Sequence, residues 1–163
     1  MKPLVAVCLL LSCALMLTEK AVSQKKAAAG GDPWAGTFKM DLSKSKFTGP
    51  APKEETATVA SANKDSIKYS IAGTDSKGNP YSITFDGKPD APGQQMVNGQ
   101  AVATLTYHMP SPREFTSSAE SADGSTSTGT VTLSKDGKTI TVHEKGKNAQ
   151  GGVQEDTAVY VRQ

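Results

Sequence analysis

The chain has 163 residues, a formal net charge of +2 at pH 7, and only two histidines and two cysteines. A charge this close to balance excludes an electrostatic footprint for nucleic acid or for an anionic membrane surface. The length predicts one domain after an N-terminal segment.

The first 23 residues predict a signal peptide. An apolar run at positions 4–17 follows Lys2 and is too short to span a bilayer comfortably, which takes about 20 residues. Ala21 and Ser23 place small residues where signal peptidase requires them, so we expect cleavage near Ser23. The mature protein is then exported to the periplasm or the cell exterior, with no membrane span.

Both cysteines, Cys8 and Cys13, lie in this segment. Cleavage leaves a mature chain without a disulfide, a thiol nucleophile or a cysteine-based metal site. A lipid anchor at Cys13 is an alternative, because residues 10–13 (Leu-Leu-Ser-Cys) resemble a bacterial lipoprotein box. The apolar run continues past Cys13, however, whereas polar residues normally follow a lipid-anchored cysteine, so the unanchored form is favoured.

Residues 24–32 contain two lysines, three alanines and two glycines in succession, which predicts a flexible lead. The domain then runs over residues 33–163. Removing the signal peptide lowers the net charge from +2 to +1. The domain has 27 large apolar or aromatic residues among 131, a lean supply for a two-sheet sandwich. A barrel with a mixed interior and room for a cavity fits this composition better.

The first strand is predicted within residues 34–47. Trp34, Phe38, Met40 and Leu42 fall on even positions with polar residues between them, and this period of two indicates a strand with one buried face. We expect the rest of the domain to close on this strand.

About nine strands are predicted, or ten with a short edge strand, and short turns join nearly all of them. Alternation is clearest at 67–71 and 81–85, and Asn98-Gly99 is the strongest hairpin signal. Residues 94–97 predict a short edge strand. The strands expected after the first one are 55–62, 66–72, 81–85, 94–97, 101–109, 115–121, 125–134, 139–147 and 154–162.

Short connections favour pairing between sequence neighbours, and no window has a helical period. An open meander of this length would expose its edge strands, so closure is expected. We therefore predict an all-β domain, a single antiparallel up-and-down barrel of eight to ten strands with the first and last strands adjacent. A β-sandwich is the alternative.

Several strand and turn motifs resemble a family of uncharacterised exported bacterial proteins described as lipocalin-like. The resemblance covers most of the mature chain and implies a lipocalin-type or calycin-like barrel, without catalytic or binding residues to transfer. The opening residues 36–39 (Gly-Thr-Phe-Lys), after Trp34, also resemble those of small fatty-acid-binding barrels. The other matching segments are 41–47, 49–53, 134–142, 148–151 and 159–160.

Candidate catalytic and metal-binding groups are few. His108 and His143 could begin a zinc site only with further ligands, and alternation places both on solvent-facing sides of their strands. No serine lies in a Gly-x-Ser-x-Gly elbow. We therefore expect no enzyme activity, no metal and no cofactor. Four aspartates next to or near glycines indicate turn chemistry rather than a calcium or paired-carboxylate site: Asp75, Asp86, Asp123 and Asp136.

The aromatic residues are the better candidates for function. They could line a cavity for a small apolar or amphipathic ligand, with tyrosine hydroxyl groups as polar contacts, or they could fill the core. The first case predicts a carrier. The second predicts an interaction or structural module that uses a strand edge or the loop at 86–93. The oligomeric state is not indicated. The candidate lining residues are Trp34, Phe38, Tyr69, Tyr81, Phe85, Tyr107 and Phe115.

Overall fold

The computed structural model describes residues 31–163, so the expected signal peptide, Cys8, Cys13 and most of the expected lead lie outside the described residues. No helix long and apolar enough to cross a membrane occurs within 31–163. The described residues form ten strands, and their bounds are β1 Gly36–Met40, β2 Glu54–Ala62, β3 Ile67–Thr74, β4 Pro80–Gly87, β5 Pro92–Val97, β6 Gln100–Ser111, β7 Glu114–Ser121, β8 Thr126–Leu133, β9 Thr139–Lys147 and β10 Val153–Arg162.

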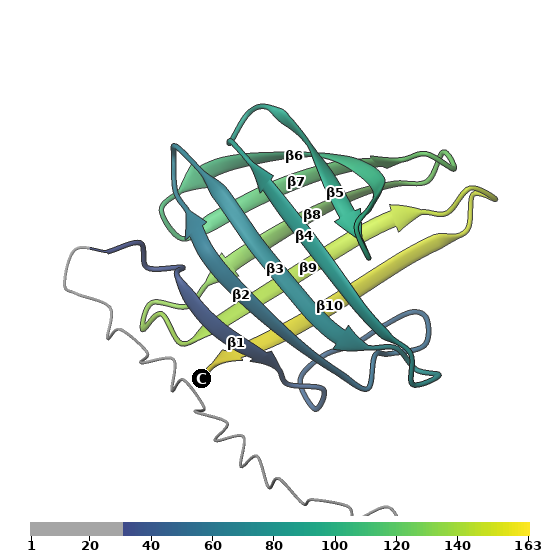
Figure 1. Ribbon diagram of the computed structural model, residues 1–163, viewed down its shortest axis with the longest axis horizontal. Helices are drawn as coiled ribbons and strands as arrows, with labels where there is room; N and C mark the ends of the chain where they lie inside the picture. The colour runs from purple at the N-terminus through teal and green to yellow at the C-terminus, as the bar shows by residue number, and fades with distance from the viewer. Residues whose placement is uncertain (1–30) are drawn as a thin grey trace, which may run out of the picture.

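The ten strands form one closed antiparallel barrel, in which each strand pairs with its sequence neighbours. The barrel closes between β1 and β10, where Phe38 lies opposite Arg162 and Met40 opposite Tyr160. Figure 1 shows this closure, with the start and the end of the domain side by side. The prediction of an up-and-down barrel with adjacent first and last strands is confirmed, and the sandwich alternative is wrong.

The period-two pattern predicts the strand faces well. In β4 the inward side chains of Tyr81, Ile83 and Phe85 alternate with the exposed Ser82 and Thr84. Hairpin chemistry holds in the same way at the β5–β6 turn. Asn98 and Gly99 there have φ values of 50° and 78°, as a two-residue type I′ turn requires.

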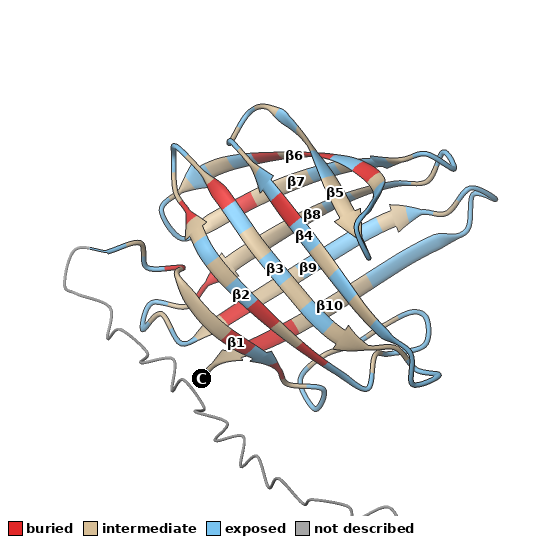
Figure 2. Cartoon of the chain, in the orientation of Figure 1, coloured by how far each residue is buried: buried red, intermediate tan, exposed pale blue. Residues whose placement is uncertain are grey.

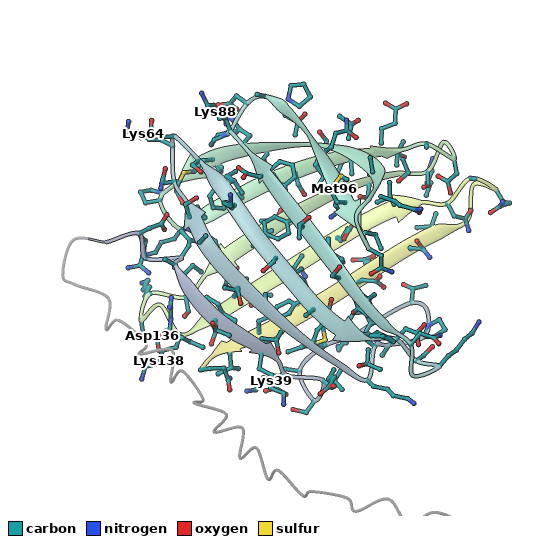
Figure 3. The ribbon with its side chains drawn as sticks, in the orientation of Figure 1. Lys39, Lys64, Lys88, Met96, Asp136 and Lys138 are labelled. Atoms are coloured by element: carbon teal, nitrogen blue, oxygen red, sulfur yellow. The ribbon has the colours of Figure 1, made fainter. Side chains whose placement is uncertain are left out.

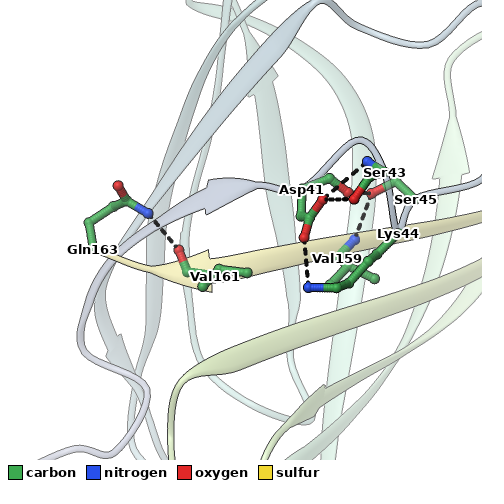
Figure 4. A network of polar contacts seen from close by, with 7 residues as sticks. All are labelled: Asp41, Ser43, Lys44, Ser45, Val159, Val161 and Gln163. Carbon is green, nitrogen blue, oxygen red and sulfur yellow. Dashed lines mark hydrogen bonds and ion pairs between the residues drawn. The ribbon is translucent and has the colours of Figure 1, made fainter.

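The first strand is shorter than predicted. Leu42, expected on the buried face, is 42 % exposed, because the chain bulges away from β10 after Asp41, whose N–H still donates to the carbonyl of Val159. Pairing with β10 resumes at Lys46, opposite Thr157. Within the bulge, Ser45 Oγ donates to the carbonyl of Asp41 and accepts from the N–H of Val159 (Figure 4). A local polar turn thus interrupts the alternation.

The Asp41 carboxylate stabilises this bulge. It accepts hydrogen bonds from the N–H and the hydroxyl of Ser43 and forms an ion pair with Lys44 at 2.8 Å (Figure 4). Lys44, together with Ser43, lowers the pKa of Asp41 to about 2. The turn is therefore held by an ionised carboxylate over nearly the whole pH range.

The prediction that residues 94–97 form an edge strand is also wrong. β5 begins at Pro92 and pairs with both β4 and β6, so residues 94–97 have no free edge. β6 runs to Ser111 and not only to Met109, and its register shifts between His108 and Ser111. This irregularity accommodates Pro110, which has no N–H to donate to the ladder.

The turns alternate between two ends of the barrel. At one end, here called the closed end, residues 32–36 lie near the turns at 63–66, 112–113 and 134–138. The other end, here called the open end, carries the connections at 41–53, 75–79, 98–99, 122–125 and 148–152. Buried residues occur toward both ends of the barrel, while β9 and β10 are largely exposed toward the open end (Figure 2). Among the charged side chains that project outward from the barrel are Lys39, Lys64 and Lys138 (Figure 3).

Candidate functional site

Residues 32–36 close one end of the barrel. The Asp32 carboxylate accepts hydrogen bonds from the N–H of Trp34, the N–H of Ala62 and the amide of Asn63, which ties it to the β2–β3 turn. Trp34 is 2 % exposed, and its indole Nε1 donates to the carbonyl of Pro112 at 3.0 Å. The segment is therefore attached to two separate turns and forms a floor across the barrel.

Arg162 completes this floor from the end of β10. Its Nε donates to the carbonyl of Gly137, its Nη1 to that of Ala35 and its Nη2 to that of Pro33, at 2.6–2.7 Å. The guanidinium also lies over the ring of Phe38, 4.3 Å from the centroid. A Cβ at Gly36 would collide with Nη1, and its φ of 144° is a conformation that other residues rarely adopt.

Above this floor the barrel contains a cavity of about 400 Å³. The size falls within the range of small-molecule sites, roughly 300–1,000 Å³. The wall toward the closed end is mostly apolar. Toward the open end, small and polar residues such as Ser121, Ser127, Gly129, Glu144 and Asp156 lie in the same lining as the apolar Met40 and Phe47. The apolar lining includes Met40, Phe47, Val59, Ile67, Ile71, Leu105, Val131, Ile140 and Val142.

A hydroxyl pair lies within the apolar wall. The hydroxyl groups of Tyr69 and Tyr107 are 2.9 Å apart, and the two rings meet edge to face. Burial raises the pKa of both phenols, and the charge of Glu144 raises them further. The pair therefore stays protonated and offers a neutral polar contact inside a greasy surface.

The seven aromatic residues proposed from the sequence fall into two groups in the structure, those that line the cavity and those that do not. Trp34, Tyr69, Tyr107 and Phe115 line the cavity. The other three are inward-facing but do not line it. Phe38 is wholly buried beneath Arg162, Phe85 packs against Tyr69 and Tyr107, and Tyr81 lies toward the open end. Whether a ligand contacts any of them stays a prediction.

Sequence reasoning missed a buried carboxylate, Glu55, which is 7 % exposed on the inner face of β2. Tyr160 donates its hydroxyl to Glu55 Oε2 at 3.0 Å. Tyr81 reaches Glu55 from β4 across Gly73, where a Cβ would meet the Tyr81 ring at 2.7 Å. Burial raises the pKa of Glu55, and the hydrogen bonds from the two tyrosines oppose that rise.

Two further carboxylates at the open end were missed. Glu144 on β9 and Asp156 on β10 line the cavity and lie directly opposite each other in the ladder. Both also line an adjoining recess of about 190 Å³ between the β7–β8 and β9–β10 hairpins, together with Ser121 and Ser127. Alternation carried the signal, because Glu144 shares a face with Val142 and Asp156 with Ala158. The cross-strand register that brings the two together is not contained in either segment.

The histidines lie outside the barrel, as the alternation predicts. His108 is exposed and its Nδ1 is 2.6 Å from Asp90, and His143 is exposed beside Thr157. No group of three histidine, cysteine, aspartate or glutamate side chains that could share a metal ion occurs within residues 31–163.

Three of the four glycine-adjacent aspartates have the predicted role in turns. Asp75 accepts from the N–H groups of Lys77 and Asn79, and Asp123 and Asp136 hold their turns in the same way. The turn role predicted for Asp86 is wrong, because Asp86 lies within β4 and forms an ion pair with Lys68 on the neighbouring strand.

No protein-family model matches this chain, and no curated protein matches it. Solved structures with a similar fold include a redesigned β-barrel, with 15% identity, a TM-score of 0.47, and 80% of this chain and 92% of that one covered. A de novo designed fluorescence-activating β-barrel has 16% identity, a TM-score of 0.44, and coverage of 82% and 99%. A structure of EF1p2_mFAP2b bound to DFHBI has 12% identity, a TM-score of 0.46, and coverage of 80% and 94%. Identities this low concern the fold alone.

Proposed function

We propose that this protein binds a small amphipathic molecule inside its barrel, as a carrier of the lipocalin-like type. The observation that carries the proposal is the cavity of about 400 Å³, which is floored at one end and has polar as well as apolar groups toward the other. Apolar walls favour the transfer of a hydrocarbon group out of water, by about 25 cal/mol for each Å² buried. The polar open end lets the other part of the ligand remain in contact with water.

The residues around the cavity support a binding role more than a filled structural core. Ala57, Ala103 and Ala119 stand where larger side chains would fill the space. The alternative of an interaction module has less strand edge to offer than an open sheet would provide, because all ten strands of residues 36–162 are joined in one closed barrel. The loop at 86–93 remains as its other surface.

Blocking the cavity tests the proposal. Ala119→Phe on β7 places a ring inside the barrel, whereas Ser118→Phe places the same ring on the outer face of the same strand. We expect the full chain to enhance the fluorescence of a neutral apolar dye. The inward variant should weaken dye binding by at least about tenfold, and the outward variant should leave it unchanged. The circular dichroism spectrum of both variants should remain that of the barrel.

Two results would contradict this function. One is a wild-type chain that neither binds the dye nor gains thermal stability with any member of a fatty-acid and terpenoid panel. The other is equal dye binding by the wild type and by a folded Ala119→Phe variant. Native mass spectrometry after extraction from the source cell gives a complementary measurement, because a co-purified small molecule would add to the mass.

Export and the absence of catalysis belong to the same proposal. Mass spectrometry of the mature protein should find an N-terminus near Gln24, whereas an acylated Cys13 would make it a lipoprotein. The solvent-facing positions of His108 and His143 support a binding role rather than hydrolysis. A hydrolase activity that is lost on His108→Ala or His143→Ala would overturn that part.

A further inference from the structure

The charges that line the cavity all have the same sign. Its lining includes three carboxylates, Glu55, Glu144 and Asp156, and no lysine, arginine or histidine from the part of the chain that the structure describes. The adjoining recess adds one cation, Lys147, which forms no ion pair with Glu144 or Asp156 within residues 31–163. The charged groups of the lining are therefore all negative, with Glu55 buried, Asp156 half-buried and Glu144 exposed at the open end.

The outer and inner faces of the barrel carry different charge pairs at adjacent positions of the β9–β10 ladder. On the outer face Lys145 lies opposite Glu155 and forms an ion pair at 2.9 Å. One residue along, on the inner face, Glu144 lies opposite Asp156, and like charges in this position repel. The opposed carboxylates thus work against the stability of the barrel, while their neighbours support it.

The protein itself satisfies these two carboxylates incompletely. Asp156 Oδ1 accepts one hydrogen bond from the N–H of Thr48. Glu144 is exposed to water at the open end, and its carboxylate forms no hydrogen bond or ion pair with residues 31–163. Glu144 and Asp156 line both the cavity and the adjoining recess, together with Ser121 and Ser127. The two carboxylates therefore lie where the apolar cavity meets the open end.

We infer that the ligand of this cavity carries a positive charge, as an amphipathic amine or quaternary ammonium compound whose head lies between Glu144 and Asp156. This inference rests on the proposed function and specifies the ligand class of the same site. The hydrocarbon part would lie against the apolar wall. Tyr69 and Tyr107 belong to the same lining, and aromatic rings are able to attract a cation as well.

Three ligands matched in chain length test the charge. Decyltrimethylammonium, decanol and decanoate are titrated calorimetrically into the full chain, below the concentrations at which they aggregate. We expect the cation to bind about tenfold or more tightly than the alcohol, and the carboxylate to bind most weakly. Calcium chloride is the inorganic control and should release no heat.

Variants assign the preference to the two carboxylates. Glu144→Gln with Asp156→Asn should weaken cation binding by about tenfold to a hundredfold and leave decanol binding unchanged. Glu120→Gln with Glu155→Gln removes the same charge from the outer face, where both residues are exposed, and should change neither.

The outcomes separate the two claims. Decanol or decanoate binding as tightly as the cation would overturn the inference and leave the cavity a binding site. An equal loss of cation binding in the outer-face variant would overturn it as well, because the effect would then come from overall charge. Calcium binding abolished by the inner-face variant would replace the organic cation by an inorganic one. If none of the three organic ligands binds, the proposed function fails together with the inference.

Discussion

The two ends of the barrel handle charged side chains in opposite ways. At the closed end Arg162 donates three hydrogen bonds to backbone carbonyls and lies over Phe38. At the open end Glu144 and Asp156 face each other across the ladder, with one hydrogen bond between them and the rest of residues 31–163. A charge whose hydrogen bonds go to three backbone carbonyls serves the fold. Charges that are left with unused acceptors are available to a ligand.

The difference also explains where the cavity lies. The polar groups of the floor form hydrogen bonds mainly with one another, so few donors or acceptors are left there for a ligand. The wall above it is apolar, and the polar capacity is concentrated toward the open end, where Ser121 and Ser127 accompany the carboxylates. A ligand that enters from the open end would therefore place its apolar part deepest.

The largest expected effect is at the closed end. Arg162→Ala removes three charge-assisted hydrogen bonds and the cover of Phe38, and it leaves the carbonyl groups of Pro33, Ala35 and Gly137 without their donor. We expect the free energy of unfolding in urea to fall by about 3–5 kcal/mol. Arg162→Lys should recover less than half of this loss, because one ammonium group cannot reach three carbonyls in a fixed fork.

Arg113→Ala is the matched control for this change. Arg113 is exposed and donates one hydrogen bond, to the carbonyl of Ser134. Its loss should cost less than about 1 kcal/mol. Equal losses for the two arginines would show that the floor contributes no more than an ordinary surface contact.

The second effect is in the wall between the two ends. Tyr107→Phe deletes one member of the hydroxyl pair and leaves the buried Tyr69 hydroxyl without that partner. The expected loss is about 1–2 kcal/mol by urea unfolding. The double variant with Tyr69→Phe should lose less than the sum of the two single losses. Strictly additive losses would contradict a direct hydrogen bond between the phenols.

The sequence carries enough information to predict the barrel because the alternation of apolar and polar residues identifies the inner face of most strands. Tyr81, Ile83 and Phe85 alternate with serine and threonine, and Asn98-Gly99 fixes a hairpin. Errors arise where a local interaction overrides the alternation. Leu42 continues the period of two in the sequence. In the structure, the hydrogen bonds of the bulge leave its side chain exposed to solvent.

The site is less accessible to such reasoning because it depends on the register between strands. Four of the seven proposed aromatic residues line the cavity. The sequence could identify them because alternation indicates which side chains of a strand point inward. Glu55, Glu144 and Asp156 share faces with apolar residues, so alternation marks them as inward too. The side-by-side position of Glu144 and Asp156 follows only from the pairing of β9 with β10.

A third prediction concerns the pH dependence of the open half. Burial raises the folded-state pKa of Glu55 above its ordinary value of 4.5. The folded state therefore binds the proton more tightly than the unfolded chain, so this contribution to stability is complete below pH 4.5 and is lost as the pH rises through the folded-state pKa. Glu55→Gln should flatten the thermal-stability profile above pH 4.5.

The gain from Glu55→Gln at pH 7 should be at most about 1 kcal/mol, because hydrogen bonds from Tyr81 and Tyr160 already offset part of the burial penalty. Glu54→Gln, the exposed neighbour on the same strand, is the control and should leave the profile unchanged. A profile for Glu55→Gln that keeps the wild-type slope would assign the pH dependence to another group.

The smallest expected effect is a gain in stability at the open end. Glu144→Gln removes the repulsion from Asp156 and should raise the free energy of unfolding by about 0.2–1 kcal/mol at low salt. In roughly 1 M salt the difference should vanish, because the repulsion is then screened over a few ångströms. Lys145→Gln, on the outer face of the same strand, breaks an attractive pair and should have the opposite sign in the same urea experiment. A loss of stability in both variants would show that Glu144 has a partner that supports the fold, and the contrast between the two ends of the barrel would then disappear.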